Sequence, residues 1–400
     1  MLECDDETMT QDEALPRFIS DCDPSVPSAA GAYVPRTPAV AERLSRAIIP
    51  ARARVMLIGQ TGVGKTTELL AFERSEQASR LVVRPPVDVY LDLDELGWHE
   101  ILVFAALWAA KEFDATGHAL ARKLADAVHP PTSTPLLSDA FTVNRGGPPS
   151  PTALQRFRNE YGRVRETIGL GRAQYWDLAT SVFEAIAEHV GKEVVLVVDG
   201  LEKMGDRSAE RIFYDERKYL HDLPCRAVVT APLALSFQPY FGDIEESFLA
   251  IERVRAVSCQ KDEAGFDFFR AIAQARGAAA VMDPDIIDEA VSWGGGLPRQ
   301  FLQLLATAAT QALTDGSPKV EKEAFARARQ RVSERWQYQL GPADFLQLGL
   351  GIHALQSKTK ARLLRLGALI EYEKPDGSLR IGINPLVGAL VKRRMGEAAQ

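Results

Sequence analysis

Residues 59–66 constrain this chain more than any other segment. They read Gly-Gln-Thr-Gly-Val-Gly-Lys-Thr and follow an apolar run at 55–58. This is the pattern G-x-x-x-x-G-K-[ST], placed where a buried strand leads into a tight loop and then a helix. Its glycines permit backbone angles that side chains would block, so that successive N–H groups can turn toward phosphate oxygens. The segment therefore predicts a phosphate-binding loop within an α/β fold.

The loop predicts a site for ATP and Mg²⁺. Lys65 is expected to reach the β- and γ-phosphates, and the Thr66 hydroxyl to coordinate Mg²⁺. The helix that begins near Lys65 would add the positive end of its dipole. The residues predicted to bind the nucleotide here are Gly59, Gln60, Thr61, Gly62, Val63, Gly64, Lys65, Thr66 and Thr67.

A second part of the site is predicted from the strand at 194–198, which runs into Asp199. A carboxylate at the carboxyl end of a parallel strand suits a Mg²⁺ ligand, although an ordinary strand-ending Asp is the alternative. Many ATPases have a catalytic acid directly after the metal-binding acid, but Gly200 occupies that position here, so Glu202 is the candidate catalytic acid. Alternatively, Glu202 is a solvated acid or an ion-pair partner of Lys203. Thr230, which follows the strand at 226–229, is expected to sense the γ-phosphate or else to form a turn before Pro232.

Bulk properties narrow the class of protein. The chain has 400 residues, a formal net charge of −7 and four widely spaced cysteines that match no zinc pattern. No apolar stretch approaches the roughly 18 residues of a membrane span, and the acidic N-terminus lacks the features of a signal peptide. We expect a cytoplasmic protein without a membrane partner.

The element pattern predicts a parallel sheet sandwiched by helices. Expected strands lie at 55–59, 87–92, 194–198, 226–230 and about 248–255, alternating with helices at about 38–48, 65–76, 98–127 and 172–190. Only helices are expected from 261 to 337. Residues 1–30 are predicted to be a disordered acidic tail, and 129–153, rich in Pro, Gly, Ser and Thr, a loop insertion.

These motifs, followed by Gly-Gly-Gly-Leu-Pro-Arg at 294–299, together resemble the AAA+ superfamily, most closely its STAND branch and the origin-recognition-like ATPases. The resemblance implies an ATPase core at 31–258 and a helical lid at 259–340. It also implies that Pro298 contacts the adenine side and that Arg299 reaches the γ-phosphate; a plain junction between two helices is the alternative. Lys203 departs from the STAND pattern, which has a further acid there, and so puts the hydrolysis rate in doubt. An arginine from a neighbouring subunit could complete the site, and the candidates are Arg211, Arg217 and Arg226.

Residues 341–400 resemble a winged helix. Helices are expected from Pro342 and at 358–366, followed by strands at 368–373 and 379–383 around a Pro-Asp-Gly turn. Residues 342–400 contain nine Lys or Arg and five Asp or Glu, which gives an excess of four positive charges. Basic residues at 357–394, with Lys358, Lys360, Arg362 and Arg365 on the second helix, would then contact DNA phosphates. Alternatively this region packs on the core as a switch or an oligomerisation element, or its charges form a solvated helix face.

Three functions remain open at this stage. The leading hypothesis is a slow ATPase switch of the STAND type, which self-associates or binds a protein partner or effector chain, and whose bacterial regulatory or defence role would rest on analogy alone. The second is a DNA-acting ATPase similar to origin-recognition or transposition helper proteins. The third is a nucleotide-binding scaffold with negligible hydrolysis.

Overall fold

The computed structural model describes residues 11–23, 30–37, 39–113, 118–128, 161–162, 164–259, 264–373 and 378–398. Its chain divides into two compact units. One comprises residues 1–39, 60–67 and 254–400, and the other comprises 40–59 and 68–253. Residues 60–67 of the phosphate loop therefore belong to the same unit as residues 254–400, whereas the resemblance placed them in a core at 31–258.

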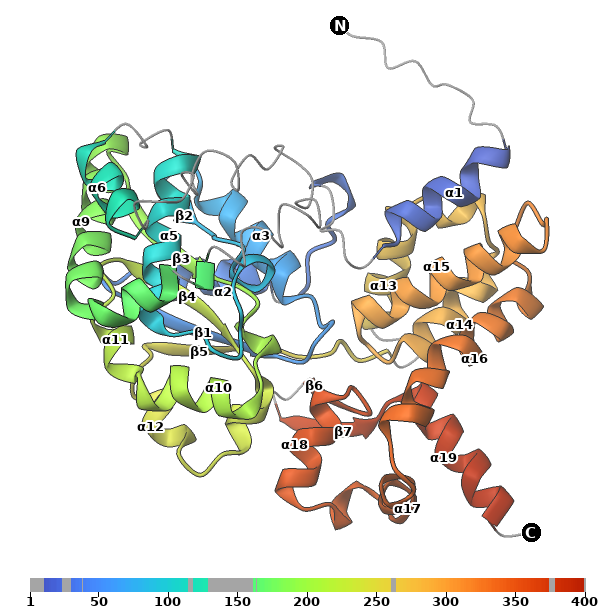
Figure 1. The fold of residues 1–400 in the computed structure, drawn as a ribbon. Coiled ribbons are helices and arrows are strands. Elements are labelled where there is room, and N and C mark those ends of the chain that lie inside the picture. The colour runs from blue at the N-terminus through green and yellow to red at the C-terminus, as the bar shows by residue number, and fades with distance from the viewer. Residues whose placement is uncertain are drawn as a thin grey trace, which may run out of the picture. The chain divides into compact units, whose positions relative to one another are not determined.

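A five-stranded sheet forms the centre of the unit at 40–253 (Figure 1). Its strands run in the order β2-β3-β4-β1-β5, and the pairings β2–β3, β3–β4 and β4–β1 are parallel. Their bounds are β1 Arg54–Gly59, β2 Arg80–Val83, β3 Glu193–Val198, β4 Arg226–Ala231 and β5 Ala250–Val254. All six residues of β1 and of β4 are buried, as expected for strands covered on both faces. The predicted α/β class is confirmed.

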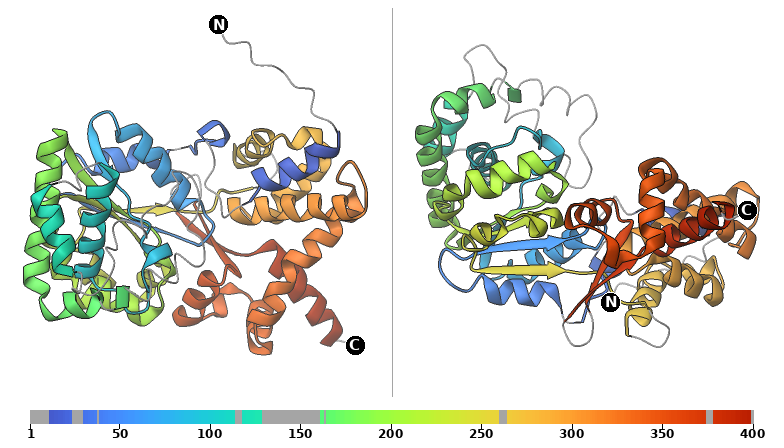
Figure 2. Two further views of the ribbon diagram at one scale, coloured as in Figure 1. Left: turned by 45° about the horizontal axis from the view of Figure 1, so that its top comes forward. Right: turned by 90° about the horizontal axis from the view of Figure 1, so that it is seen from below.

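Helices lie on both sides of this sheet, as the right-hand view of Figure 2 shows. The longest, α9, packs against α5 and α6, and its bounds match the predicted helix at 172–190. Helix α3 likewise matches the prediction of 65–76. The helices between β1 and β5, with α2 before them, are α2 Val40–Ala47, α3 Lys65–Glu76, α4 Val87–Tyr90, α5 Trp98–Glu112, α6 Ala119–Val128, α9 Arg172–Val190, α10 Asp206–Glu210, α11 Arg217–His221 and α12 Phe241–Glu245.

Two predictions in this unit were wrong. The segment 87–92, predicted as a strand, begins with the short helix α4, and the strand is β2 at Arg80–Val83. Val87 and Tyr90 are both buried at helical spacing, and the Tyr90 N–H donates to the Pro86 carbonyl at 3.3 Å. The predicted helix at 98–127 is two helices, because α5 ends where Phe113 leaves the helical region at φ −105° and ψ 22°.

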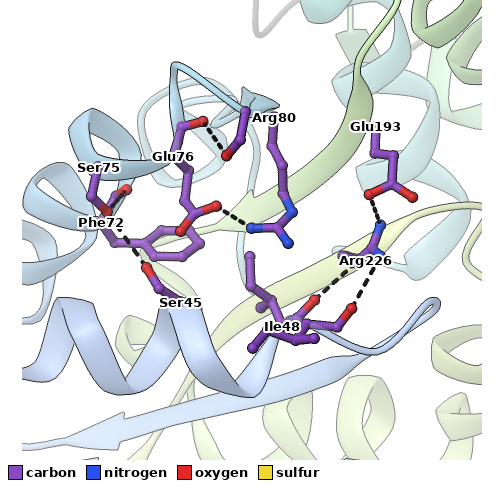
Figure 3. Close-up of polar contacts among 10 residues, drawn as sticks. Ser45, Ile48, Phe72, Ser75, Glu76, Arg80, Glu193 and Arg226 are labelled. Carbon is purple, nitrogen blue, oxygen red and sulfur yellow. Dashed lines mark hydrogen bonds and ion pairs between the residues drawn. The ribbon is translucent and has the colours of Figure 1, made fainter.

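Arg226 forms hydrogen bonds and an ion pair at the amino end of the sheet (Figure 3). Arg226, the first residue of β4, donates from Nε to the Ile48 carbonyl at 2.8 Å and from Nη2 to the Ile49 carbonyl at 3.2 Å. Its Nη1 also pairs with Glu193 at 2.8 Å. With all of its guanidinium nitrogens engaged and a residue exposure of 9%, Arg226 is not available to a neighbouring subunit. Its candidacy as a trans-acting arginine was wrong.

The other unit contains a helical region and a C-terminal region with a hairpin. Strands β6 (Leu369–Glu373) and β7 (Leu379–Ile383) pair antiparallel. The predicted Pro-Asp-Gly turn lies outside the described residues, as does the predicted insertion at 129–153. The helices of this unit are α1 Gln11–Asp21, α13 Ala264–Gln274, α14 Pro284–Gly294, α15 Pro298–Thr314, α16 Lys322–Gln339, α17 Pro342–Leu350, α18 Ser357–Arg365 and α19 Pro385–Ala398. Helix α19 was not predicted, and the winged-helix interpretation stays a prediction.

The prediction of a disordered tail at 1–30 was wrong where the structure describes it. Helix α1 packs against α15, and Leu15 and Phe18 of α1 are buried together with Cys22, which follows the helix. These side chains recur at helical spacing, so the stripe outweighs the acidic composition of the segment. The Arg276 Nε also donates to the Asp21 carbonyl at the end of α1, at 3.1 Å.

Candidate nucleotide site

The loop after β1 has the backbone that a phosphate cradle requires. Gly62 and Gly64 have φ of 83° and 100°, in the left-handed region that only glycine adopts readily. The Val63 N–H donates to the Gln60 carbonyl at 3.3 Å, and the buried Lys65 donates from Nζ to the same carbonyl at 3.1 Å. Lys65 is also the first residue of α3, so the loop ends at a helix amino terminus, where anions are favoured.

The start of α15 lies directly against this loop. The Arg299 N–H donates to the Gly62 carbonyl at 3.1 Å, and a Cβ on Gly62 would lie 2.8 Å from the Arg299 Cβ. Pro298 is also close, since its Cγ lies 4.0 Å from the position of a Cβ on Gly64. The structure thus brings together two of the motifs that carried the resemblance, the loop and the Pro298-Arg299 segment. The roles of Pro298 and Arg299 toward adenine and γ-phosphate stay predictions.

Arg36 is a third component, and sequence reasoning missed it. Its Nη1 donates to the Arg255 carbonyl at 2.8 Å and its Nη2 donates to the Val63 carbonyl. The guanidinium also lies over the Phe268 ring, 5.7 Å from the centroid, and Nη2 would be 3.2 Å from a Cβ on Gly64. Nothing in the sequence marks an arginine between Pro35 and Thr37 as a neighbour of the loop.

Asp199 and Thr230 share one edge of the sheet with the end of β1. In the strand register Thr230 is level with Leu57, and Val198 with Val229, so Asp199 follows β3 at the carboxyl edge, where α/β sheets bind ligands. The fully buried Thr230 hydroxyl accepts from the Leu201 N–H at 3.1 Å and donates to the Val198 carbonyl at 3.4 Å. Thr230 therefore holds the turn after Asp199, and its role as a phosphate sensor stays a prediction.

Gly200 occupies a position where any side chain would clash with a neighbour and strain the backbone. Its φ is 93°, and a Cβ there would lie 2.5 Å from the Asp88 Cβ and 2.6 Å from its Cγ. The Gly200 N–H donates to Asp199 Oδ1 at 2.9 Å, which fixes one carboxylate oxygen. The absence of an acid at position 200 thus follows from steric exclusion by Asp88 and from the backbone angle.

Asp88 is itself paired with Lys203. Burial acts to lower the pKa of Lys203, but the hydrogen bond and charge of Asp88, with the charges of Glu202 and Asp199, raise it above its ordinary value. Lys203 therefore stays charged. Glu202 lies beside it in a short 3-10 turn (Leu201–Lys203) and is half-buried. The catalytic role of Glu202 and the metal-binding role of Asp199 stay predictions.

The remaining arginine candidates differ from Arg226. Arg211 donates to the Leu96 carbonyl at 2.7 Å, and Arg217 donates to the Tyr214 carbonyl at 2.9 Å while its guanidinium lies 4.9 Å from the centre of that ring. Both are partly exposed. Their roles toward a neighbouring subunit stay predictions.

Mg²⁺ would have to be held by few protein groups. Within the described ranges no cluster of three or more His, Cys, Asp or Glu converges as a metal cage. Mg²⁺ usually binds through one or two protein ligands together with water and substrate phosphates. The predicted ligands, the Thr66 hydroxyl and the Asp199 carboxylate, are each an oxygen donor of the type that Mg²⁺ binds, and both stay predictions.

The C-terminal basic residues are only partly available. Lys358 and Arg365 of α18 are exposed and Lys360 is half-buried, whereas Arg362 pairs with Asp344. Arg380 lies over the Tyr372 ring, 4.7 Å from its centroid. In the part of the chain that the structure describes, no helix combines the length and apolar character needed to cross a bilayer.

Comparison with known proteins gives likenesses of fold. No family model and no curated protein sequence matches this chain. The solved structure of Cdc6p from Pyrobaculum aerophilum aligns with 95% of this chain and 99% of its own, at 14% identity and a TM-score of 0.46. The Walker-type ATPase PABY2304 of Pyrococcus abyssi aligns over 88% and 94%, at 15% identity and 0.44. ORC1 of Aeropyrum pernix, solved in complex with DNA, aligns over 90% and 93%, at 15% identity and 0.41. At such scores these likenesses establish no shared ligand or activity.

Proposed function

We propose that this chain binds ATP with Mg²⁺ in the loop at 59–67 and hydrolyses it slowly. The observation that supports this most is the loop itself, in which Gly62 and Gly64 have left-handed backbone angles and Lys65 begins a twelve-residue helix. Backbone N–H groups, a lysine and a helix amino terminus are the groups that bind nucleotide phosphates.

We propose a low hydrolysis rate because Gly200 and Lys203 stand at two positions where related patterns have acidic residues. Many ATPases have a catalytic acid at the position that Gly200 occupies, and here Asp88 leaves no room for one. Glu202, three residues after Asp199 in the sequence, is then the acid proposed to position a water molecule, with Asp199 as the Mg²⁺ ligand. Such a protein suits a switch, in which nucleotide state changes self-association or partner binding.

The test begins with nucleotide binding. Calorimetric titration of the full chain with ATP and Mg²⁺ is expected to show one site, which Lys65→Met abolishes. Lys123→Ala, which changes an exposed lysine of α6, serves as the control and should bind as the wild type does. Wild-type protein that binds no ATP would refute the proposal.

Turnover and assembly distinguish the functions. Glu202→Gln should reduce phosphate release from the wild type, whereas a wild-type rate at background would leave only the nucleotide-binding scaffold. Mass measurement with and without ATP should show a change in assembly, and an oligomer size independent of ATP would exclude the switch.

DNA binding through 357–394 remains the second candidate. The exposed side chains of Lys358 and Arg365 favour it. Affinity for duplex DNA that falls steeply with salt, and falls further in a Lys358→Ala/Arg365→Ala variant, would support it.

A further inference from the structure

Gln60, the second residue of the phosphate loop, has a side chain whose hydrogen bonds are made to the C-terminal region. It is only 5% exposed. Its Nε2 donates to the carbonyl of Leu364 in α18 at 2.9 Å and to the carbonyl of Leu369 in β6 at 2.7 Å. Its Oε1 accepts from the Glu371 N–H, also in β6, at 2.8 Å. Every donor and acceptor type of the amide is therefore used within one buried contact.

The contact has the form of strand pairing. Leu369 and Glu371 are two apart in β6, so their backbone groups point to the same edge of the hairpin, away from β7. A primary amide carries a donor and an acceptor, as a peptide group does. Gln60 thus takes the place of one residue of a neighbouring strand, and the Ala256 N–H continues the same edge by donating to the Glu371 carbonyl at 3.0 Å.

The backbone of Gln60 supports the loop at the same time. Its carbonyl accepts from the Val63 N–H and from Lys65 Nζ, two groups of the same loop. One residue therefore joins the loop to the hairpin: the main chain braces the loop, and the side chain binds α18 and β6. Gln60 is therefore bonded at both ends, to the loop and to the hairpin.

We propose that this Gln60 contact couples nucleotide binding to docking of α18 and β6, within residues 357–373. The docked hairpin holds Gln60 in place, so the loop is ordered before phosphate arrives and less ordering entropy is lost on binding. Coupling of this kind is reciprocal, so bound nucleotide must stabilise docking by the same factor. The inference rests on the proposed nucleotide binding and adds the means by which the C-terminal region senses it.

Gln60→Glu tests the contact with almost no change in shape. A carboxylate keeps the acceptor for the Glu371 N–H but faces the carbonyl oxygens of Leu364 and Leu369 without a donor. The matched control is Gln330→Glu, the same substitution at an exposed site in α16 of the same unit. The measurements are the Kd for ATP with Mg²⁺, by calorimetry, and hydrogen exchange of peptides covering 364–373, with and without ATP, in the full chain.

The expected results are specific. In the wild type and in Gln330→Glu, ATP should slow exchange at 364–373. In Gln60→Glu the Kd should rise about tenfold, and exchange at 364–373 should be faster and insensitive to ATP.

Three outcomes would overturn the coupling. A wild type that binds no ATP refutes the proposed function and the coupling with it. ATP binding with an unchanged Kd and unchanged exchange in Gln60→Glu refutes the coupling alone. Should Gln60→Glu fail to fold, the wild-type comparison decides, because saturating ATP that leaves exchange at 364–373 unaltered also refutes it.

Discussion

Substitution of Gly200 by alanine should destabilise the protein more than its backbone angle alone explains. A non-glycine residue in the left-handed region costs about 1–2 kcal/mol. The added Cβ would also lie 2.5 Å from the Asp88 Cβ, whereas carbon atoms in contact prefer about 3.5–4.0 Å. Relieving that overlap by moving α4 or the turn after β3 should cost about 1–3 kcal/mol more. The expected total is about 2–5 kcal/mol.

The chain supplies a matched control in Gly191. It has φ of 70° at the end of α9, and a Cβ there would meet no atom within 4 Å. Gly191→Ala carries the backbone strain and the same change in the unfolded chain, but not the overlap. The difference between the two variants therefore isolates the contact with Asp88.

Urea unfolding followed by circular dichroism measures both variants. The midpoint should fall further for Gly200→Ala than for Gly191→Ala at unchanged slope. Equal free energies of unfolding, within about 0.5 kcal/mol, would refute the steric argument. The same argument predicts that Gly200→Glu does not create a faster ATPase, and a gain in turnover would contradict it.

Two further predictions concern side chains in the same unit. His99 packs edge-on against Trp176 and Tyr219, and burial, aided by the charges of Arg172 and Lys218, lowers its pKa from 6.5 to about 4. Because the pKa of His99 is lower in the folded state than in the unfolded state, the free energy of unfolding should fall by about 3 kcal/mol as pH drops from 6.5 to 4. His99→Phe should remove that part of the pH dependence of urea unfolding. An unchanged pH profile in His99→Phe would contradict the prediction. Arg226→Ala should destabilise the fold by about 2–4 kcal/mol through three lost interactions, yet leave ATP turnover per folded molecule unaltered, and a specific loss of turnover would restore its candidacy as a trans-acting arginine.

Much of the sheet could be predicted because its signals are local. The runs at 55–58 and 194–198 are continuously apolar, as strands buried on both faces must be, and the glycine pattern after the first fixes the loop and the start of α3. The prediction of a strand at 87–92 was wrong because six residues of alternating apolar and polar character do not distinguish a strand from one helical turn whose buried residues are three apart.

The parts of the site that could be predicted are those formed by residues close together in the sequence. The positions of Gly62, Gly64 and Lys65 followed from the motif. The resemblance gave Arg299 a role toward the γ-phosphate, which stays a prediction, and did not give its N–H contact with Gly62. Arg36 could not be found, because its relation to the loop depends on how distant segments pack. The same is true of Asp88, whose side chain excludes an acid from position 200.

The reach of Gln60 along the chain has a consequence for biosynthesis. Its three hydrogen-bond partners lie 304, 309 and 311 residues downstream. At about 5–20 residues per second, a ribosome needs on the order of 15–60 seconds to make that stretch. The strands and helices up to β5 can form while the nascent phosphate loop still lacks the hairpin that orders it. A chain interrupted before β6 would keep the whole phosphate-binding motif and lose the contact that shapes it, so only finished molecules carry the complete loop.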